Sequence, residues 1–269
     1  ENARFDPGHD AVMMGYDFHI TPEGPRLIEV NTNAGGALLA WQAQAAANGK
    51  PFPFHGQRNQ IMDSFNKEMR LFSNGQKNQP ECVIILDEEP EKQFLYNEMQ
   101  QFVALFAQRG ICAAIAAPDA LELRANTLFY QDKPVDMIYN RHCDFYLESQ
   151  PMAHVRTAWL NRQICLSPNP RIYGLLSDKR RMTLWSDPQI LADLKLSPAE
   201  QQQLLTLTPQ TRTMDTLDLT TLWQDRRFWV FKPITSHGGK GVLLGRSISR
   251  GRFDALIPSQ TLAQRLAPP

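Results

Sequence analysis

The chain has 269 residues, of which 42% are hydrophobic, and its 28 basic and 28 acidic residues give a formal net charge of zero. This length and composition predict a soluble globular protein of one large or two ordinary domains. The neutral balance argues against the broad basic surface that nucleic acids or anionic membranes select, so any anion must be held locally.

The cysteines and the hydropathy pattern set further limits. The chain contains Cys82, Cys112, Cys143 and Cys165. They form no CxxC pair and no zinc-ligand spacing, so we expect reduced thiols in a cytoplasmic protein. No apolar run approaches the about 18 residues that span a bilayer, and the first residues lack the features of a signal peptide. Because the chain begins without Met and ends directly after a strand-like run, we expect it to be part of a longer protein.

The first predicted element is a β-hairpin over 12–32 with the turn TPEGP. Side chains alternate along a strand, so Glu29 and Asn31 share one face of RLIEVNT. Counting back across the turn places Asp17 opposite Glu29, and two facing carboxylates repel each other. We therefore expect a positive group between them. An oxygen-rich corner of this kind is also a setting that Mg²⁺ prefers.

The middle of the chain predicts an alternating α/β arrangement. In order, the expected segments are a helix over 37–49, a helix over 57–72, a linker over 73–81, a strand over 82–86, a helix over 94–110 and a strand over 111–118. The succession of strand, helix and strand predicts a parallel βαβ unit. A hairpin with its turn at Gln131 to Pro134 is expected next, and 152–166 reads as a helix.

The last third predicts short helices followed by a strand with a glycine-rich turn. Residues 175–187 and 188–206 read as helical, the latter with a capping box formed by Ser197 and Glu200. The strand FWVFKP carries Lys232, and the turn SHGGKG after it offers backbone N–H groups and a lysine to an anion such as phosphate. The turn is not a Walker loop, because GxxxxGK[ST] is absent. The signatures GxSxG, HExxH and GxGxxG are absent as well.

Four stretches together resemble the ATP-grasp superfamily. EVNTNAGG resembles its metal-binding strand, and VFKP with SHGGKGV resembles its nucleotide-binding strand and glycine-rich lid. LLSDKRRM is similar to the segment of the first ATP-binding lysine, and TLAQRLAPP looks like the hinge strand whose backbone meets adenine. The order, with the E-x-N strand first, resembles the permuted layout of eukaryotic-type glutathione synthetase over roughly the whole chain.

The resemblance implies an α/β fold in which a Rossmann-like substrate domain accompanies a circularly permuted ATP-grasp module. It implies a large-lobe segment with the metal-binding hairpin over 1–75, a Rossmann-like domain over 80–166, and a small lobe with lid and hinge strand over 167–269. The implied activity is an ATP- and Mg²⁺-dependent ligase that joins a carboxylate to an amine through an acyl phosphate.

The resemblance also implies roles for individual residues. Asp17, Glu29 and Asn31 would hold Mg²⁺, and Lys179 and Lys232 would bind the phosphates of ATP. The other implied nucleotide contacts are Ser236, His237, Gly238, Gly239, Lys240 and Gly241 in the lid and Gln264, Arg265 and Leu266 in the hinge strand. The implied oxyanion donors are the backbone N–H groups of Gly35 and Gly36.

Substrate binding is predicted from position. Arg141 follows the strand VDMIYN at a sheet's carboxyl edge, where a guanidinium suits a substrate carboxylate. The expected partners are small-molecule carboxylate and amine substrates, without nucleic acid or membrane, and a homodimer is left open.

Alternatives remain at this stage. Glutathione synthetases of this type carry a glutamate in the glycine loop where this chain has Ser236 and His237, and ATP-grasp ligases commonly have an arginine at the position of Gly15. These departures suit a non-catalytic nucleotide-binding regulatory or scaffold protein with the same fold. Lys179 lies in a charged KRR run that also suits a solvated helix face.

Overall fold

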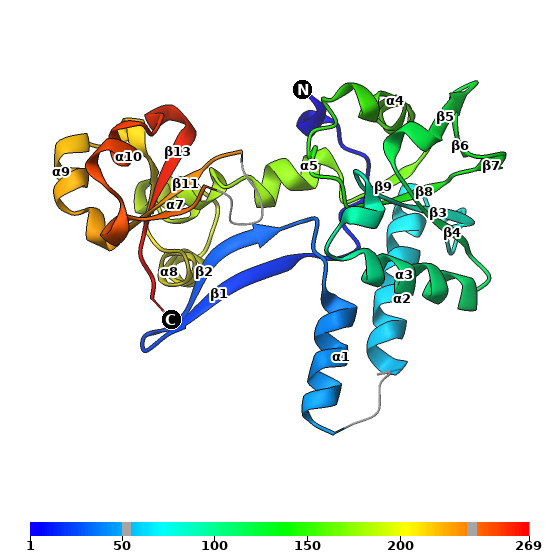
Figure 1. The fold of residues 1–269 in the computed structure, drawn as a ribbon, viewed down its shortest axis with the longest axis horizontal. Coiled ribbons are helices and arrows are strands. Elements are labelled where there is room, and N and C mark those ends of the chain that lie inside the picture. Colours follow the sequence, from blue (N-terminus) through cyan, green and yellow to red (C-terminus); the bar gives the residue numbers. More distant parts are fainter. Residues whose placement is uncertain (50–54, 236–240, 269) are drawn as a thin grey trace. The chain divides into compact units, whose positions relative to one another are not determined.

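The computed structural model describes residues 1–49, 55–235 and 241–268 and has the mixed α/β character predicted from the sequence. The chain forms two compact units (Figure 1). Unit 1 contains residues 1–15 and 31–175, and unit 2 contains residues 16–30 and 176–269. Among the described residues, no helix combines the length and the apolar character that crossing a membrane requires.

Unit 1 is built on a four-stranded parallel sheet. Its strands are β3 (Cys82–Leu86), β4 (Cys112–Ala116), β8 (Met137–Asn140) and β9 (Cys165–Ser167), in the order β4-β3-β8-β9. The helix α3 (Tyr96–Gln108) connects β3 to β4, so the predicted βαβ unit is confirmed. The sequence prediction was wrong at the end of 152–166, because Cys165 and Leu166 belong to β9 rather than to a helix.

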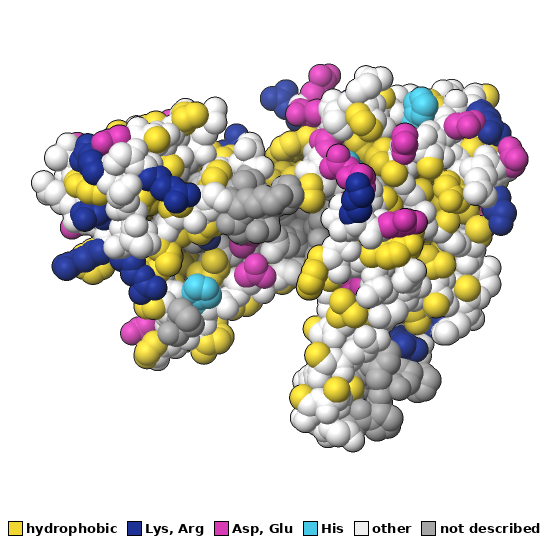
Figure 2. All heavy atoms as spheres, in the orientation of Figure 1, with side chains coloured by type: hydrophobic (Ala, Val, Ile, Leu, Met, Phe, Trp, Pro, Cys, Tyr) yellow, Lys and Arg dark blue, Asp and Glu magenta, His cyan; other side chains and the backbone are white. Residues whose placement is uncertain are grey.

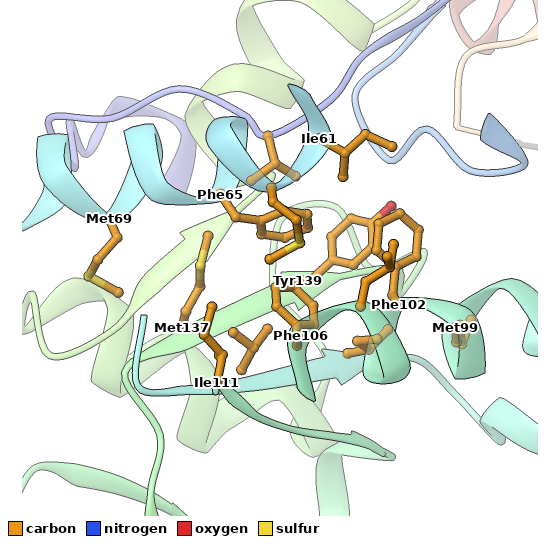
Figure 3. Close-up of a cluster of buried hydrophobic side chains, with 14 of the residues drawn as sticks. Ile61, Phe65, Met69, Met99, Phe102, Phe106, Ile111, Met137 and Tyr139 are labelled. Atoms are coloured by element: carbon orange, nitrogen blue, oxygen red, sulfur yellow. The ribbon is translucent and has the colours of Figure 1, made fainter. Parts of the chain in front are cut away.

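Helices cover both faces of this sheet. They are α1 (Ala37–Ala47), α2 (His55–Phe72), α3 and α4 (Ala153–Leu160). Figure 3 shows Phe65 of α2 and Phe102 and Phe106 of α3 around Tyr139 of β8. The ring centroids of Phe65 and Tyr139 lie 5.3 Å apart in an edge-to-face arrangement, a geometry that adds about 1 kcal/mol to apolar burial. A second hydrophobic cluster, which includes Ile84 of β3 and Trp159 of α4, lies between the sheet and α4.

The two units therefore differ from the three segments predicted from the sequence. Residues 31–75 were assigned to a lobe separate from the Rossmann-like domain. In the structure they belong to unit 1, because α2 buries Ile61, Phe65 and Met69 in the same core as the parallel sheet. The contacts that decide this grouping link residues far apart in sequence.

A small antiparallel sheet completes unit 1. Its strands are β5 (Leu121–Arg124), β6 (Thr127–Tyr130) and β7 (Lys133–Pro134). The predicted hairpin with its turn at Gln131 to Pro134 is therefore corrected: β6 pairs with the two-residue β7, and residues 137–140 join the parallel sheet as β8. Figure 2 shows acidic and basic side chains interspersed over the visible face of unit 1, as the neutral net charge leads one to expect.

Unit 2 combines the predicted hairpin with a four-stranded antiparallel sheet. The hairpin is β1 (Gly15–Thr21) and β2 (Gly24–Asn31), with Gly15 and Asn31 themselves in unit 1. The predicted five-residue turn TPEGP is corrected, because Thr21, Gly24 and Pro25 belong to the strands and the turn is Pro22 and Glu23. The sheet contains β10 (Thr211–Thr213), β11 (Trp229–Pro233), β12 (Leu243–Leu244) and β13 (Thr261–Arg265), in the order β10-β13-β11-β12.

Short helices accompany this sheet. They are α6 (Arg181–Trp185), α7 (Pro188–Asp193), α8 (Pro198–Leu207), α9 (Leu219–Gln224) and α10 (Arg250–Asp254). The capping box is confirmed at the start of α8, where Glu200 N–H donates to Ser197 Oγ and Ser197 N–H donates to Glu200 Oε2. Unit 2 also contains the helical turns η7 (Arg226–Phe228) and η8 (Gly245–Ser247). The helix α5 (Pro170–Ile172) belongs to unit 1, and the π-helix η5 (Tyr173–Ser177) leads from unit 1 into unit 2.

Candidate functional site

Strand β11 points Lys232 away from the core of unit 2. Side chains alternate along a strand, and Trp229 and Phe231 lie in the hydrophobic cluster of this unit. Lys232 therefore projects from the opposite face, where it is only 7% exposed. Its Nζ donates a hydrogen bond to the carbonyl oxygen of Ile28, at 3.2 Å. A lysine predicted from sequence to contact phosphate thus lies against strand β2.

The side chain of Lys232 lines a narrow hollow that lies entirely within unit 2. The hollow is lined by Ile28, Glu29, Val30, Leu176, Ser177, Asp178, Lys179, Met182, Thr211, Lys232, Leu262 and Gln264. Its volume is about 10 Å³, about the space of one water molecule. Five of the lining side chains are apolar, and four, Glu29, Asp178, Lys179 and Lys232, are charged. Small-molecule sites usually enclose about 300 Å³ or more, so a nucleotide can enter only when these walls move apart.

Two lysines and a carboxylate meet in this hollow. Lys179 is 8% exposed, and its Nζ lies 3.8 Å from Glu29 Oε1. Burial lowers the pKa of Lys232 to about 8, a shift that Glu29 and Asp17 oppose and that Lys179 reinforces. The positive group expected beside the two carboxylates is therefore present, and lysine side chains supply it. Lys179 is buried, so a solvated helix face does not describe its position.

The predicted metal ligands are oxygen donors on the hairpin. Asp17 is on β1, whereas Glu29 and Asn31 are on β2 and share one face by strand alternation. Among the described residues, no group of three or more His, Cys, Asp or Glu side chains is arranged to hold a metal. Two carboxylates and an amide fit a hard cation such as Mg²⁺, provided that phosphate oxygens complete its coordination.

The sheet occupies part of the backbone of 264–266, which was predicted to contact adenine. Strand β13 lies between β10 and β11, so its backbone groups are used in pairing. The N–H of Arg265 donates to Gln210 O and the N–H of Leu266 donates to Phe228 O, each at 2.8 Å. Gln264 remains a candidate through its buried side chain, which lines the hollow and donates to Thr211 Oγ1.

Most of the predicted lid lies outside the described residues. This applies to Ser236, His237, Gly238, Gly239 and Lys240. Gly241 is described, and its φ is +77°. A Cβ there would come within 2.8 Å of Pro233 Cγ. Both the positive φ and this close approach require glycine at position 241.

Unit 1 contains a second group of predicted residues, at the carboxyl edge of its parallel sheet. Arg141 follows β8, as predicted, and its Nη1 donates to the carbonyl oxygens of Asn33 and Ala34. A Cβ on Gly35 would overlap Arg141 Nη2. The glycine therefore lets the guanidinium lie against the loop. Among the described residues, Nε and Nη2 of Arg141 have no hydrogen-bond acceptor of their own.

Gly36 is corrected as an oxyanion donor. Its N–H donates to Glu98 Oε2 at 2.6 Å, and the N–H of Leu38 donates to Glu98 Oε1 at 2.9 Å. Glu98 projects from α3, is 2% exposed, and accepts the first N–H groups of α1. A carboxylate at a helix N-terminus is favoured by the helix dipole. The N–H of Gly36 is therefore already paired inside the protein, whereas Gly35 stays a candidate.

Asp87 is a functional candidate that the sequence analysis missed. It follows β3, next to the strand that leads to Arg141, and the chain leaves these two strands in opposite directions along the sheet. Ligands of open α/β sheets bind at such a switch point. Burial raises the pKa of Asp87 to about 6, although Glu88 N–H and Arg141 oppose the shift. The acidic stretch DEEPE, residues 87–91, was the feature of the sequence that could have indicated this candidate.

An open, largely apolar hollow of about 440 Å³ lies near Gly35 in unit 1. It is lined by Met13, Met14, Gly15, Ala34, Gly35, Gly36, Ala37 and Ala40. This volume is in the range of small-molecule sites. Gly15, where an arginine is common in ATP-grasp ligases, contributes to the wall and leaves the hollow uncharged.

Comparison with known proteins gives a structural match only. No family model and no curated protein matches the sequence. The fold matches the crystal structure of a putative gamma-glutamylcysteine synthetase from Methylobacillus flagellatus, with a TM-score of 0.53 and 11% sequence identity. The match covers 96% of this chain and 68% of that chain. At this identity the similarity shows a shared fold over almost the whole chain.

Proposed function

We propose that the protein is an ATP- and Mg²⁺-dependent ligase that joins a carboxylate to an amine through an acyl phosphate. The observation that carries the proposal is the meeting of Lys179, Lys232 and Glu29 in one buried hollow of unit 2. Three separate stretches of sequence supply these residues. The fold shared with a protein named as a synthetase supports the same class of reaction.

In this proposal the two buried lysines bind nucleotide phosphates. Their charges are weakly screened, so they stabilise the negative charge that builds up during phosphoryl transfer. Met182, Leu262 and the neighbouring apolar side chains provide a surface for the base. Glu29 now lies near Lys179, and phosphate would replace it as the partner of the lysines. Glu29 would then be released to bind the cation.

Mg²⁺, held by Asp17, Glu29 and Asn31 with phosphate oxygens, would supply charge neutralisation and orientation of the phosphates. Residues 236–241 would cover the γ-phosphate and exclude water from the acyl phosphate. Because the N–H of Gly36 is paired with Glu98, the oxyanion of acyl transfer would be met by the N–H of Gly35.

The carboxyl edge of the unit 1 sheet would bind the substrate. Arg141 is held by Nη1, so its remaining N–H groups can take a carboxylate in a fixed orientation. Asp87, when ionised, can pair with an ammonium group. Together they suit an amino-acid-like substrate, and the adjoining hollow around Gly35 suits an uncharged side chain.

The first test is ATP binding measured by calorimetry with and without Mg²⁺, on the protein and on Lys232→Met and Glu29→Gln. We expect Lys232→Met to weaken binding at least tenfold in both conditions, and Glu29→Gln to remove most of the Mg²⁺ dependence. Lys195→Met is the matched control, since Lys195 is an exposed lysine of the same unit. Absence of ATP binding by the parent protein would contradict the proposal.

A second candidate is a nucleotide-binding regulatory or scaffold protein that does not turn over. The pairing of Gly36 N–H with Glu98 favours it, because one predicted oxyanion donor is lost. ADP release in the presence of pairs of amino acids separates the two. Substrate-dependent release that disappears in Arg141→Ala supports the ligase, whereas ATP binding without any release supports the regulatory protein.

A further inference from the structure

Two cysteines of unit 1 are direct neighbours on adjacent strands. Cys82 is the first residue of β3 and Cys112 is the first residue of β4, and the two are register partners in the parallel sheet. Both side chains face the hydrophobic cluster on the side of α4. Thirty residues separate them in sequence, so their spacing gave no sign of this contact.

The two cysteines are register partners on adjacent strands, and their surroundings differ. Cys82 is 5% exposed, whereas Cys112 is half-buried. Burial raises the pKa of Cys82 to about 12, and a hydrogen bond to Cys112 adds to the shift. Cys82 therefore keeps its proton. Cys112 is the more accessible of the two thiols.

A cation lies beside the accessible sulfur. Lys133 projects from β7, and its Nζ lies 3.7 Å from Cys112 Sγ. The thiolate is the reactive form of cysteine, and Lys133 brings a positive charge beside the Cys112 sulfur. Cys112 thus has Cys82 as its neighbour on β3, a positive charge beside its sulfur, and access to solvent.

We propose that Cys82 and Cys112 are an oxidation site, which a hydroperoxide converts to a reversible disulfide. Strands in a sheet lie about 4.8 Å apart, within the Cα separation of about 4.4 to 6.8 Å that a disulfide requires. The spacing of adjacent strands therefore meets the Cα requirement for a bond between Cys82 and Cys112.

The reaction balances with one equivalent of hydrogen peroxide. The Cys112 thiolate attacks one peroxide oxygen, the O–O bond breaks, and the leaving hydroxide takes a proton to give water and a sulfenic acid on Cys112. Cys82 sulfur then attacks the Cys112 sulfur. The S–O bond breaks, the Cys82 proton goes to the leaving hydroxide, and a second water forms. Two thiols are oxidised and one peroxide is reduced to two waters.

This site is separate from the proposed ligase residues. Cys82 begins β3 at the amino edge of the sheet, whereas Asp87 follows its carboxyl end. The thiol pair can thus be tested whether or not the protein binds ATP. A thiol reductant reverses the bond by exchange.

The test is treatment of the folded protein with one equivalent of hydrogen peroxide, followed by alkylation and peptide mapping by mass spectrometry. We expect a Cys82–Cys112 linked peptide that disappears after dithiothreitol. Cys143→Ser should give the same linked peptide, since Cys143 is exposed and lies on neither β3 nor β4. In Cys82→Ser, a sulfenic acid should remain on Cys112 and react with dimedone.

Two further results decide the roles. Lys133→Met should slow formation of the linked peptide at least threefold, and circular dichroism verifies that each variant is folded. In urea the preference for the Cys82–Cys112 pair should fall to the statistical level of four cysteines. Oxidation of Cys143 without a Cys82–Cys112 link in the folded protein would overturn the proposal.

Discussion

Lys232 carries its charge where burial makes that charge costly. Its pKa falls from 10.5 in water to about 8 in the folded protein. Between these values the unfolded chain binds more protons, so stability rises with pH from about 8 to 10.5 and the full cost is present below 8. A difference of one pKa unit corresponds to about 1.36 kcal/mol, so burying the charged lysine lowers the free energy of unfolding by about 3 kcal/mol. A residue that lowers stability in this way is typical of a functional site.

Lys232→Met should therefore stabilise the protein at pH 7, by about 1–3 kcal/mol. The gain should shrink toward zero as the pH rises toward and above 10.5, because the lysine is by then neutral in the folded state and increasingly neutral in the unfolded state. Urea unfolding at pH 7 and at pH 10 measures both values. Lys195→Met, an exposed substitution, should change stability by less than about 0.5 kcal/mol at either pH. An equal effect of Lys232→Met at both pH values would contradict the explanation.

The pKa of Asp87 predicts the opposite change of stability with pH, in the acidic range. Its pKa rises from 3.8 to about 6 on folding, so the folded state binds more protons between these values and stability falls as pH rises through them. Asp87→Asn should stabilise the protein at pH 7.5 by about 1–2 kcal/mol, after allowance for solvent screening, and should be nearly neutral at pH 4. Thermal unfolding at the two pH values checks this. Asp119→Asn, at an exposed aspartate of unit 1, should show no such difference.

At the scale of elements, the turns η7 and η8 depend on one glycine. A Cβ on Gly245 would overlap the carbonyl oxygen of Arg226, and backbone atoms cannot move aside as a flexible side chain can. Gly245→Ala should cost at least about 3 kcal/mol, measured by urea unfolding. Gly251, inside α10, has open space around it. Gly251→Ala should instead stabilise by about 0.5–1 kcal/mol. Similar effects at the two glycines would show that the close approach does not control this packing.

The elements also show what sequence reasoning can reach. The β1–β2 hairpin, the β3–α3–β4 unit and the α8 capping box were predicted because each is defined by neighbouring residues. Strand β9 was missed because three residues, Cys165 to Ser167, form too short an apolar run to distinguish a strand from a helix. Its pairing with β8 decides its structure.

In the candidate sites, too, features set by neighbouring residues were predicted and features set by tertiary contacts were missed. Lys179, Lys232 and Glu29 were found because charged residues on or beside apolar strands stand out in a sequence. The pairing of Glu98 with Gly36, and of Leu266 N–H with Phe228 O, joins segments about 60 and 40 residues apart. Which backbone groups remain free for a ligand is therefore set by tertiary contacts, and no local pattern reports them.

At the scale of the whole molecule, neither unit is a continuous stretch of chain. Unit 2 needs residues 16–30 as well as 176–269. Cleavage at an engineered protease site replacing 194–196, which lies between α7 and α8, should therefore leave the two fragments together. They should co-elute on size exclusion in buffer and separate in urea. Separation in buffer would mean that the hairpin and α6 contribute little to unit 2.

The hairpin has a consequence for synthesis on the ribosome. Strand β1 exposes Tyr16, Phe18 and Ile20 even in the finished protein. The hairpin leaves the ribosome well before residues 176–269, with which it forms unit 2. At about 5–20 residues per second, this delay is on the order of ten to fifty seconds. During that time the apolar side chains of the hairpin stay exposed, although unit 1 can already fold. The nascent chain therefore presents chaperones with a binding segment whose partner has not yet been translated.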